Sequence, residues 1–219
     1  MGKRKCHALL AACVVLLFAG APTAAQARSS DTVSVLTEAL RGELYAQHAY
    51  LAFAKKASEE KYVRIGALFT ALSVSEGIHA RNFAQALAKL GVTANLDKPD
   101  IVVVDTRANL KKAADAELQE IDVKYPSFLK RVRAENQDDI AKVITWAWQA
   151  EKQHRDLVTQ LQTGAATFFG MVVNTIEGNK VAYFVCQTCG STLVEMPKEK
   201  CPNCGSPASV YTKVEGTGV

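Results

Sequence analysis

Glu76-Gly-Ile-His79 and Glu151-Lys-Gln-His154 are the two stretches of sequence that decide the fold of this chain. Each places a glutamate three residues before a histidine, and residues at that spacing share one face of an α-helix. Each stretch can therefore direct a carboxylate and an imidazole at the same point. A single pair of this kind is common on solvated helix surfaces and indicates little, whereas two pairs in one chain can form a site together.

The two stretches belong to an internal repeat. The first offset between the copies is 74 residues and the next three are 75, so one inserted residue accounts for all four. The repeat predicts two related helix pairs that face each other, with a site of approximate two-fold symmetry between them. Its members are Glu43, Tyr50, Glu76 and His79 in the first copy and Glu117, Tyr125, Glu151 and His154 in the second.

Apolar residues recur at helical spacing through most of the chain. Asp31 and Asp138 suit helix starts, and Gly91 suits a helix end. Residues 92–105 are long for a connection between adjacent helices and include Pro99, so we expect a crossover along the bundle. The predicted helices span residues 31–59, 61–90, 106–135 and 137–163.

The composition changes after Gly164, where glycines and prolines punctuate short segments such as Lys180–Val185 that favour strands. With 219 residues, 48% of them hydrophobic, the chain can build one sizeable core and a small second domain. We therefore predict a mainly α protein in three mature parts: a four-helix bundle at 31–164, a linker at 165–178 and a small β domain at 179–219.

Glu43 on the first predicted helix and Glu117 on the third supply partner carboxylates for the two Glu-x-x-His pairs. One glutamate from each of two helices and a Glu-x-x-His pair from each of the others is the ligand set of ferritin-like di-iron bundles. Several carboxylates balance the charge of two metal ions and can bridge them, while imidazole adds a nitrogen ligand that suits iron. Carboxylates buried without a metal would be costly.

Four cysteines, Cys186, Cys189, Cys201 and Cys204, form two Cys-x-x-Cys-Gly knuckles. This spacing brings four thiolates into a tetrahedron, which both iron and zinc accept. Two disulfides are the alternative in an oxidising compartment, although the glycine after each pair suits metal knuckles better. The spacing predicts a metal site and leaves the choice between iron and zinc open.

The chain resembles the rubrerythrin family over residues 31–215, on the bundle motifs and the cysteine knuckles together. A further mark of that family is Glu120, three residues after Glu117 and a candidate seventh ligand. The resemblance implies a ferritin-like bundle with a di-iron centre and a rubredoxin-like domain holding one iron, with zinc possible there. One departure is Tyr183-Phe184-Val185 before the first knuckle, where rubrerythrins often have a tryptophan.

Carried over residue by residue, the resemblance implies that Glu76 and Glu151 bridge the two irons. Glu43 would be terminal on the first iron, and Glu117 with His154 would bind the second.

The resemblance further implies that Glu120 and His79 exchange on the first iron as the iron is oxidised and reduced. Tyr50 and Tyr125 would orient carboxylates from outside the ligand set, although core tyrosines would give the same sequence. These four residues are the catalytic candidates.

The activity implied by the resemblance is reduction of hydrogen peroxide to water, with electrons relayed through the four-cysteine site. A ferroxidase or iron store is the first alternative, and a zinc-loaded structural protein is the second. The cysteine domain weighs against storage, which needs no electron entry. We expect hydrogen peroxide as substrate, an electron donor outside the cytoplasm and a homodimer.

The N-terminus carries the features of a secretory signal. Lys3, Arg4 and Lys5 precede an apolar run, and a small-residue cleavage site ends at Ala27. The run is shorter than a spanning helix needs, so we expect cleavage after residue 27 and export, to a bacterial periplasm. Without residues 1–27, 23 basic side chains face 22 acidic ones, which indicates neither a nucleic acid nor a membrane surface as partner.

Overall fold

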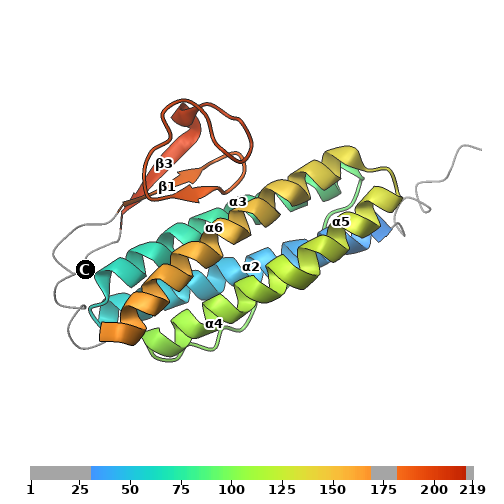
Figure 1. Cartoon of the computed structure of the whole chain (residues 1–219). Helices are drawn as coiled ribbons and strands as arrows, with labels where there is room; N and C mark the ends of the chain where they lie inside the picture. The colour runs from blue at the N-terminus through green and yellow to red at the C-terminus, as the bar shows by residue number, and fades with distance from the viewer. Residues whose placement is uncertain (1–30, 169–181, 216–219) are drawn as a thin grey trace, which may run out of the picture.

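The computed structural model describes residues 31–168 and 182–215, and it describes side chains at 31–161 and 182–215. Four long helical segments form an antiparallel bundle, as the sequence predicts (Figure 1). The third segment consists of two α-helices joined without a break by a π-helix, Glu120–Lys124. The helices are α2 (Asp31–Glu59), α3 (Val63–Lys89), α4 (Thr106–Gln119), α5 (Tyr125–Ala134) and α6 (Asp138–Phe168).

The π-helix accounts for the inserted residue in the sequence repeat. The backbone N–H of Tyr125 donates to the carbonyl oxygen of Glu120, five residues earlier, instead of the usual four. Seven residues separate Glu43 from Tyr50 in the first copy, and eight separate Glu117 from Tyr125 in the second. The wider turn absorbs the extra residue, so both tyrosines still face the bundle interior.

The connection from α3 to α4 is the predicted crossover. Gly91 follows the end of α3 with φ of 72°, a left-handed conformation that glycine adopts without strain. The chain then runs back along the bundle without regular structure to Asp105 (Figure 1). The Asp105 carboxylate accepts from the backbone N–H of Ala108 at 2.8 Å and so caps the start of α4.

Two apolar clusters fill the bundle, one toward each end. The first is built around Phe53, Phe69 and Leu72, and the second around Leu36 and Phe83. The glutamates and histidines of the repeat lie between these clusters in sequence on every helix, so the polar site sits at mid-bundle, enclosed by apolar packing. Within the described residues no helix is long and apolar enough to cross a membrane.

The cysteine domain is a three-stranded antiparallel sheet in the order β2-β1-β3. Its strands are β1 (Ala182–Cys186), β2 (Thr192–Leu193) and β3 (Tyr211–Glu215), with a short 3₁₀-helix at Ala208–Val210. The domain lies on the face of the bundle formed by α3 and α6 (Figure 1). Tyr183, Val185 and Val214 join the first apolar cluster of the bundle, so the two domains share part of one core.

The boundary between the domains differs in detail from the sequence prediction. Helix α6 continues past Gly164 to Phe168, so the predicted linker at 165–178 starts inside a helix. The rest of that linker and the predicted signal peptide at 1–27 lie outside the described residues.

Candidate metal centre

Six buried side chains from all four helical segments converge at mid-bundle. They form two overlapping groups in which every ligand atom lies within 4.8 Å of the others. Glu76 and Glu151 belong to both groups, which is the position of bridging carboxylates. The first group is Glu43, Glu76, His79 and Glu151, and the second is Glu76, Glu117, Glu151 and His154.

The two imidazoles stack across the site with ring centres 5.9 Å apart. The Nδ1 atom of His79 lies 2.9 Å from Glu76 and 3.0 Å from Glu151. The Nδ1 atom of His154 lies 3.1 Å and 3.0 Å from the same two carboxylates. Each pair of a glutamate and a histidine three residues apart therefore meets the other pair, as the repeat predicts.

The outer nitrogens of both histidines contact the cysteine domain. His79 Nε2 lies 3.2 Å from the carbonyl oxygen of Cys189. A carbonyl only accepts, so this nitrogen carries the proton. His154 Nε2 lies 3.3 Å from the hydroxyl of Thr192, whose own proton goes to the carbonyl of Gly190. With Nε2 committed to these contacts, Nδ1 is the ring nitrogen that faces the carboxylates, and a metal would bind there in place of the Nδ1 proton.

Burial and crowding set the electrostatics of the site. Burial raises the pKa of Glu43 and of Glu117 well above the usual value, and neighbouring carboxylates add to the effect. Burial lowers the pKa of His154, but Coulombic attraction from Glu76 and Glu151 outweighs this and raises that pKa to about 9. The site therefore favours added positive charge at its centre.

The hydrogen bonding of the carboxylates fits a metal. One oxygen of each of Glu43, Glu76, Glu117 and Glu151 is buried and accepts no well-directed hydrogen bond. Those of Glu76 and Glu151 have only the ion-pair contact with a histidine Nδ1, at 3.1 and 3.0 Å. An unsatisfied buried oxygen costs about 1–3 kcal/mol, and more when charged. Two cations placed among these oxygens and the two Nδ1 atoms would satisfy all of them. The mixture of carboxylate and imidazole suits iron, so the residues fit a di-iron centre.

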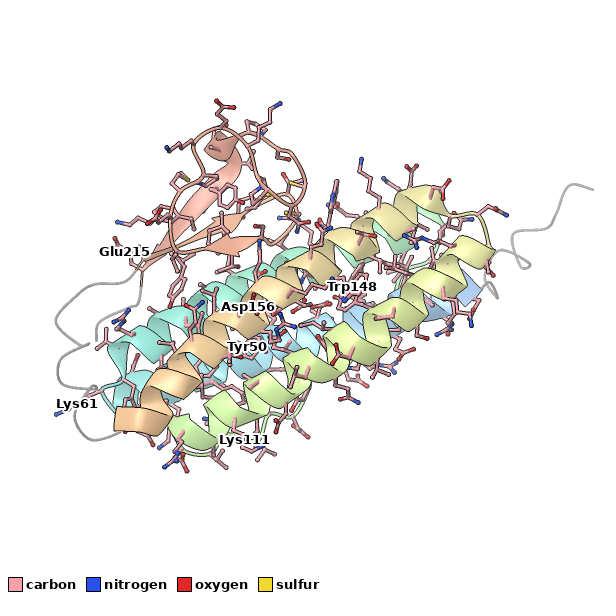
Figure 2. The ribbon with its side chains drawn as sticks, viewed as in Figure 1. Tyr50, Lys61, Lys111, Trp148, Asp156 and Glu215 are labelled. Carbon is pink, nitrogen blue, oxygen red and sulfur yellow. The ribbon has the colours of Figure 1, made fainter. Side chains whose placement is uncertain are left out.

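Each tyrosine of the repeat binds a glutamate of the opposite copy. The Tyr50 hydroxyl donates to Glu117 at 2.5 Å, and the Tyr125 hydroxyl donates to Glu43. Figure 2 shows Tyr50 inside the bundle. Both tyrosines are buried. Each holds one carboxylate oxygen of its glutamate, and the other oxygen, which accepts no hydrogen bond, is left for a metal.

Glu120 lies at the rim of the site, outside both groups. Its carboxylate accepts from Lys124 Nζ at 3.0 Å, one turn further along the π-helix. Burial and the charge of Glu151 raise the pKa of Glu120 to about 7. The predicted seventh ligand is thus close to the other six without joining them.

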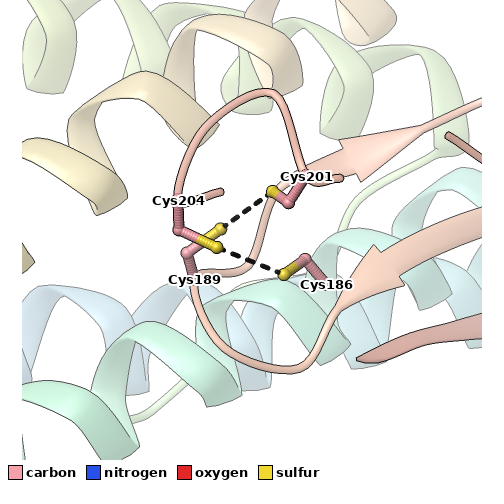
Figure 3. Close-up of side chains that lie close together, drawn as sticks. All are labelled: Cys186, Cys189, Cys201 and Cys204. Atoms are coloured by element: carbon pink, nitrogen blue, oxygen red, sulfur yellow. Dashed lines mark hydrogen bonds between the residues drawn. The ribbon is translucent and has the colours of Figure 1, made fainter. Parts of the chain in front are cut away.

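The four cysteine sulfurs lie within 4.8 Å of one another, from two facing knuckles (Figure 3). Cys186 and Cys204 sulfurs are 3.8 Å apart, and Cys189 and Cys201 sulfurs are 3.6 Å apart. These distances exceed a disulfide bond of about 2 Å, and all four cysteines are free. The cluster has the composition of a tetrahedral iron or zinc site.

Further contacts fix the cysteine domain on the bundle. The Ser75 hydroxyl donates to the carbonyl of Gly190 at 2.6 Å, and the Asn82 amide donates to the carbonyl of Thr188 at 2.9 Å. On the other side, the Asn203 amide donates to the carbonyl of Trp146 at 2.8 Å. The contact between the two metal sites is therefore braced from both α3 and α6.

The sequence did not point to Thr192 or Lys124, and it identified Gly190 as a knuckle glycine without its contact to the bundle. Lys124 had a usable signal, since it lies four residues after Glu120 on a predicted helix. Thr192 and the bundle contact of Gly190 had none, because their role depends on how two domains pack. His48 lies outside the site: its Nδ1 atom donates to the carbonyl of Leu44 on its own helix at 2.7 Å.

The fold and the two sites define a class: carboxylate-bridged di-metal proteins of the ferritin-like bundle type with an attached four-cysteine domain. A structure of fully reduced, all-ferrous nigerythrin matches with a TM-score of 0.68 and 27% identity, over 91% of this chain and 100% of that one. A bacterioferritin of Desulfovibrio desulfuricans, described with a diiron site, shares the fold, with a TM-score of 0.66 over 73% of this chain and 93% of that one at 20% identity.

The chain belongs to the rubrerythrin family, because a family model described as Rubrerythrin matches residues 34–162. Rubrerythrin-2 of Clostridium acetobutylicum is 29% identical over 81% of this chain and 94% of its own length. A rubrerythrin of Porphyromonas gingivalis is 27% identical over 84% and 90%. Family membership supports a di-iron oxidoreductase active against oxidative stress.

Proposed function

We propose that this chain is a peroxidase that reduces hydrogen peroxide to water in the bundle, with electrons delivered from the four-cysteine site. The observation that carries the proposal is the contact of His79 Nε2 with the carbonyl of Cys189 at 3.2 Å. His79, a candidate ligand of the bundle site, thereby contacts Cys189, a candidate ligand of the cysteine site. An electron at the cysteine site could therefore reach the bundle site through Cys189 and His79, which one hydrogen bond joins.

A bound di-iron centre supplies two electrons, with which peroxide and two protons become two waters. The chain's own residues prepare the place for this chemistry. The apolar clusters on either side exclude bulk water, which strengthens every electrostatic interaction inside. The Tyr50 and Tyr125 hydroxyls hold Glu117 and Glu43 in position. A substrate as small as peroxide needs no larger pocket.

The division of labour between the two sites follows from their ligands. Four thiolates on two short knuckles, three of them buried, change little when a metal between them gains or loses an electron. The bundle site instead has a spare carboxylate, Glu120, at its rim. One site is suited to electron transfer and the other to a change of ligands during reaction.

A ferroxidase or iron store is the main alternative, and a zinc-loaded structural protein the second. An iron store does not need a cysteine domain that contacts both histidines of the bundle site. A structural role gives no reason for a spare carboxylate, Glu120, at the rim of a site that already has six ligands. Both observations favour the peroxidase.

We propose further that the protein is exported to a periplasm after cleavage near Arg28, that it works as a homodimer and that its electron donor is extracytoplasmic. The basic, apolar and small-residue pattern of residues 1–27 supports export, and an exported protein needs an extracytoplasmic donor. N-terminal sequencing of protein from its native host should begin at or near Arg28. A cytoplasmic protein beginning at Met1 would contradict export.

The peroxidase proposal is tested by separating single from repeated turnover. Cys204 is the most exposed of the four cysteines and lies on the knuckle that does not touch the bundle histidines. Iron-loaded Cys204→Ser protein, chemically reduced, should still consume about one equivalent of peroxide, because its bundle holds two electrons. Steady turnover with an external reductant should be lost.

Exposed Ser209→Ala, in the same domain, serves as the control and should turn over like wild type. If reduced wild-type protein leaves peroxide unconsumed, or if Cys204→Ser sustains steady turnover, the proposal is wrong.

A further inference from the structure

The π-helix makes the two halves of the metal centre unequal. It carries Glu120 and Lys124 at the rim. The corresponding positions of the first copy are Tyr45 or Ala46, and Ala49, none of them charged. The two-fold symmetry of the ligands is therefore broken by one acid and one base, both on the inserted turn.

Glu120 faces the first ligand group. It lines a cavity of about 20 Å³ together with Glu43, Lys124 and Tyr125, which is the space of about one water. On the neighbouring helix α2, Gly42 has no side chain, and a Cβ atom there would lie 3.8 Å from the Glu120 carboxylate. The Glu120 side chain thus has room to move beside Glu43, the terminal carboxylate of that group.

Lys124 is placed to compete with a metal for this carboxylate. Its ammonium binds Glu120 at 3.0 Å, with the lysine side chain 36% exposed and the glutamate side chain 16% exposed. The ammonium is a single charge held from the solvent side, so a metal ion of higher charge in the first group can draw the Glu120 carboxylate away from it. Among the described residues no other lysine or arginine forms an ion pair with Glu120.

We propose that Lys124 is a positioning residue that holds Glu120 at the rim and so sets how readily Glu120 binds a metal in the first group. The proposal rests on the proposed function, because it says which residue controls the binding of the spare carboxylate, Glu120, to a metal. A more highly charged ferric ion draws the carboxylate away from Lys124 more strongly than a ferrous ion does. Lys124 therefore favours the ferrous state of the first position.

The test is a redox titration of the iron-loaded full chain, with the midpoint potential of the di-iron centre followed by electron paramagnetic resonance. Four proteins form the main comparison: wild type, Lys124→Met, Glu120→Gln and the double variant. Lys124→Met should lower the potential, with a gain in ferric over ferrous affinity on the order of tenfold, the scale of one charge-assisted hydrogen bond. Lys124→Arg should restore the wild-type potential.

The Glu120→Gln background separates two effects of Lys124: its hold on the Glu120 carboxylate and its positive charge near the metals. Removal of Lys124 also removes a positive charge near the metals, and that effect persists without Glu120. The positioning role predicts that Lys124→Met shifts the potential much less in the Glu120→Gln background. Lys111→Met, which breaks the exposed Lys111–Asp115 pair at the same spacing on α4, is the matched control and should not shift it.

Equal shifts in both backgrounds, or no shift in either, would overturn the role of Lys124. This result is independent of peroxide turnover. Wild-type protein that fails to consume peroxide would refute the proposed function, while the potentials would still decide what Lys124 does.

Discussion

The Tyr50 hydroxyl donates a hydrogen bond to Glu117, a residue of the opposite helix pair 67 positions away in the sequence, at 2.5 Å. The Tyr125 hydroxyl makes the reciprocal bond to Glu43. The two halves of the bundle are thus joined through the carboxylates that face the metal positions. Each tyrosine both holds a candidate ligand and ties the halves together.

Tyr50→Phe should weaken both the positioning of Glu117 and the link between the two halves of the bundle. Loss of the hydroxyl leaves the buried Glu117 carboxylate without its donor, which should lower the free energy of unfolding of the metal-free protein by about 1–3 kcal/mol. Metal affinity at the bundle should fall about 10–100-fold, the usual effect of losing such a partner.

Chemical unfolding and competitive metal titration measure the two effects. Tyr45→Phe is the control, because Tyr45 is 49% exposed on the same helix. If Tyr50→Phe binds metal as tightly as Tyr45→Phe does, the hydroxyl does not position Glu117.

The ligands of both sites could be predicted from the sequence because they obey short-range rules. The Glu-x-x-His spacing follows from helix geometry, and the repeat supplied the pairing of the halves. The same comparison located an inserted residue, although only the structure shows that a π-helix accommodates it.

The contact between the sites could not be predicted in this way. It depends on Gly190 and Thr192 of one domain meeting His79 and His154 of another. No local periodicity encodes how two folded domains pack, so sequence patterns gave the two sites separately. The hydrogen bonds of the two tyrosines to the opposite halves could not be predicted either, because the repeat does not say which carboxylate each hydroxyl reaches.

Metal removal should destabilise the bundle. Unsatisfied oxygens on four buried glutamates are neutralised when two cations bind. A ligand that binds only the folded state, present at 1,000 times its dissociation constant, stabilises that state by about 4 kcal/mol. Thermal unfolding of chelator-treated protein, with and without added ferrous iron, should show a clear rise in Tm on reloading. In Glu76→Gln/Glu151→Gln protein the rise should be largely lost. An unchanged Tm in wild type would mean that the bundle does not bind metal in its folded core.

Glu120→Ala should leave the fold and two bundle metals in place, because six other ligands remain. The rate of peroxide reduction should fall on the order of tenfold, the effect of losing about 1.4 kcal/mol of transition-state stabilisation. Rapid mixing of reduced protein with peroxide measures this rate. Asp122→Ala, an exposed acid on the same π-helix, is the control. A wild-type rate in Glu120→Ala would indicate a ferroxidase-type centre that does not use the seventh carboxylate.

The contact between the two sites offers a pair of matched glycines. Gly190 and Gly205 follow equivalent knuckles, with φ of 78° and 75°, so an alanine strains both alike. At Gly190 the added Cβ would lie 2.3 Å from His79 Nε2. At Gly205 nothing lies within 4 Å. Gly190→Ala should therefore push the cysteine domain off the bundle, while Gly205→Ala should leave it in place.

The decisive measurement is the rate at which the four-cysteine iron is reoxidised when peroxide is mixed with fully reduced, fully iron-loaded protein, followed by visible absorption. Electron delivery through the contact of Cys189 with His79 predicts rapid reoxidation in wild type and in Gly205→Ala. In Gly190→Ala, with the same iron content, reoxidation should be at least about tenfold slower, as expected when one close contact is lost. Equal rates in the two glycine variants would contradict electron delivery through the contact of Cys189 with His79.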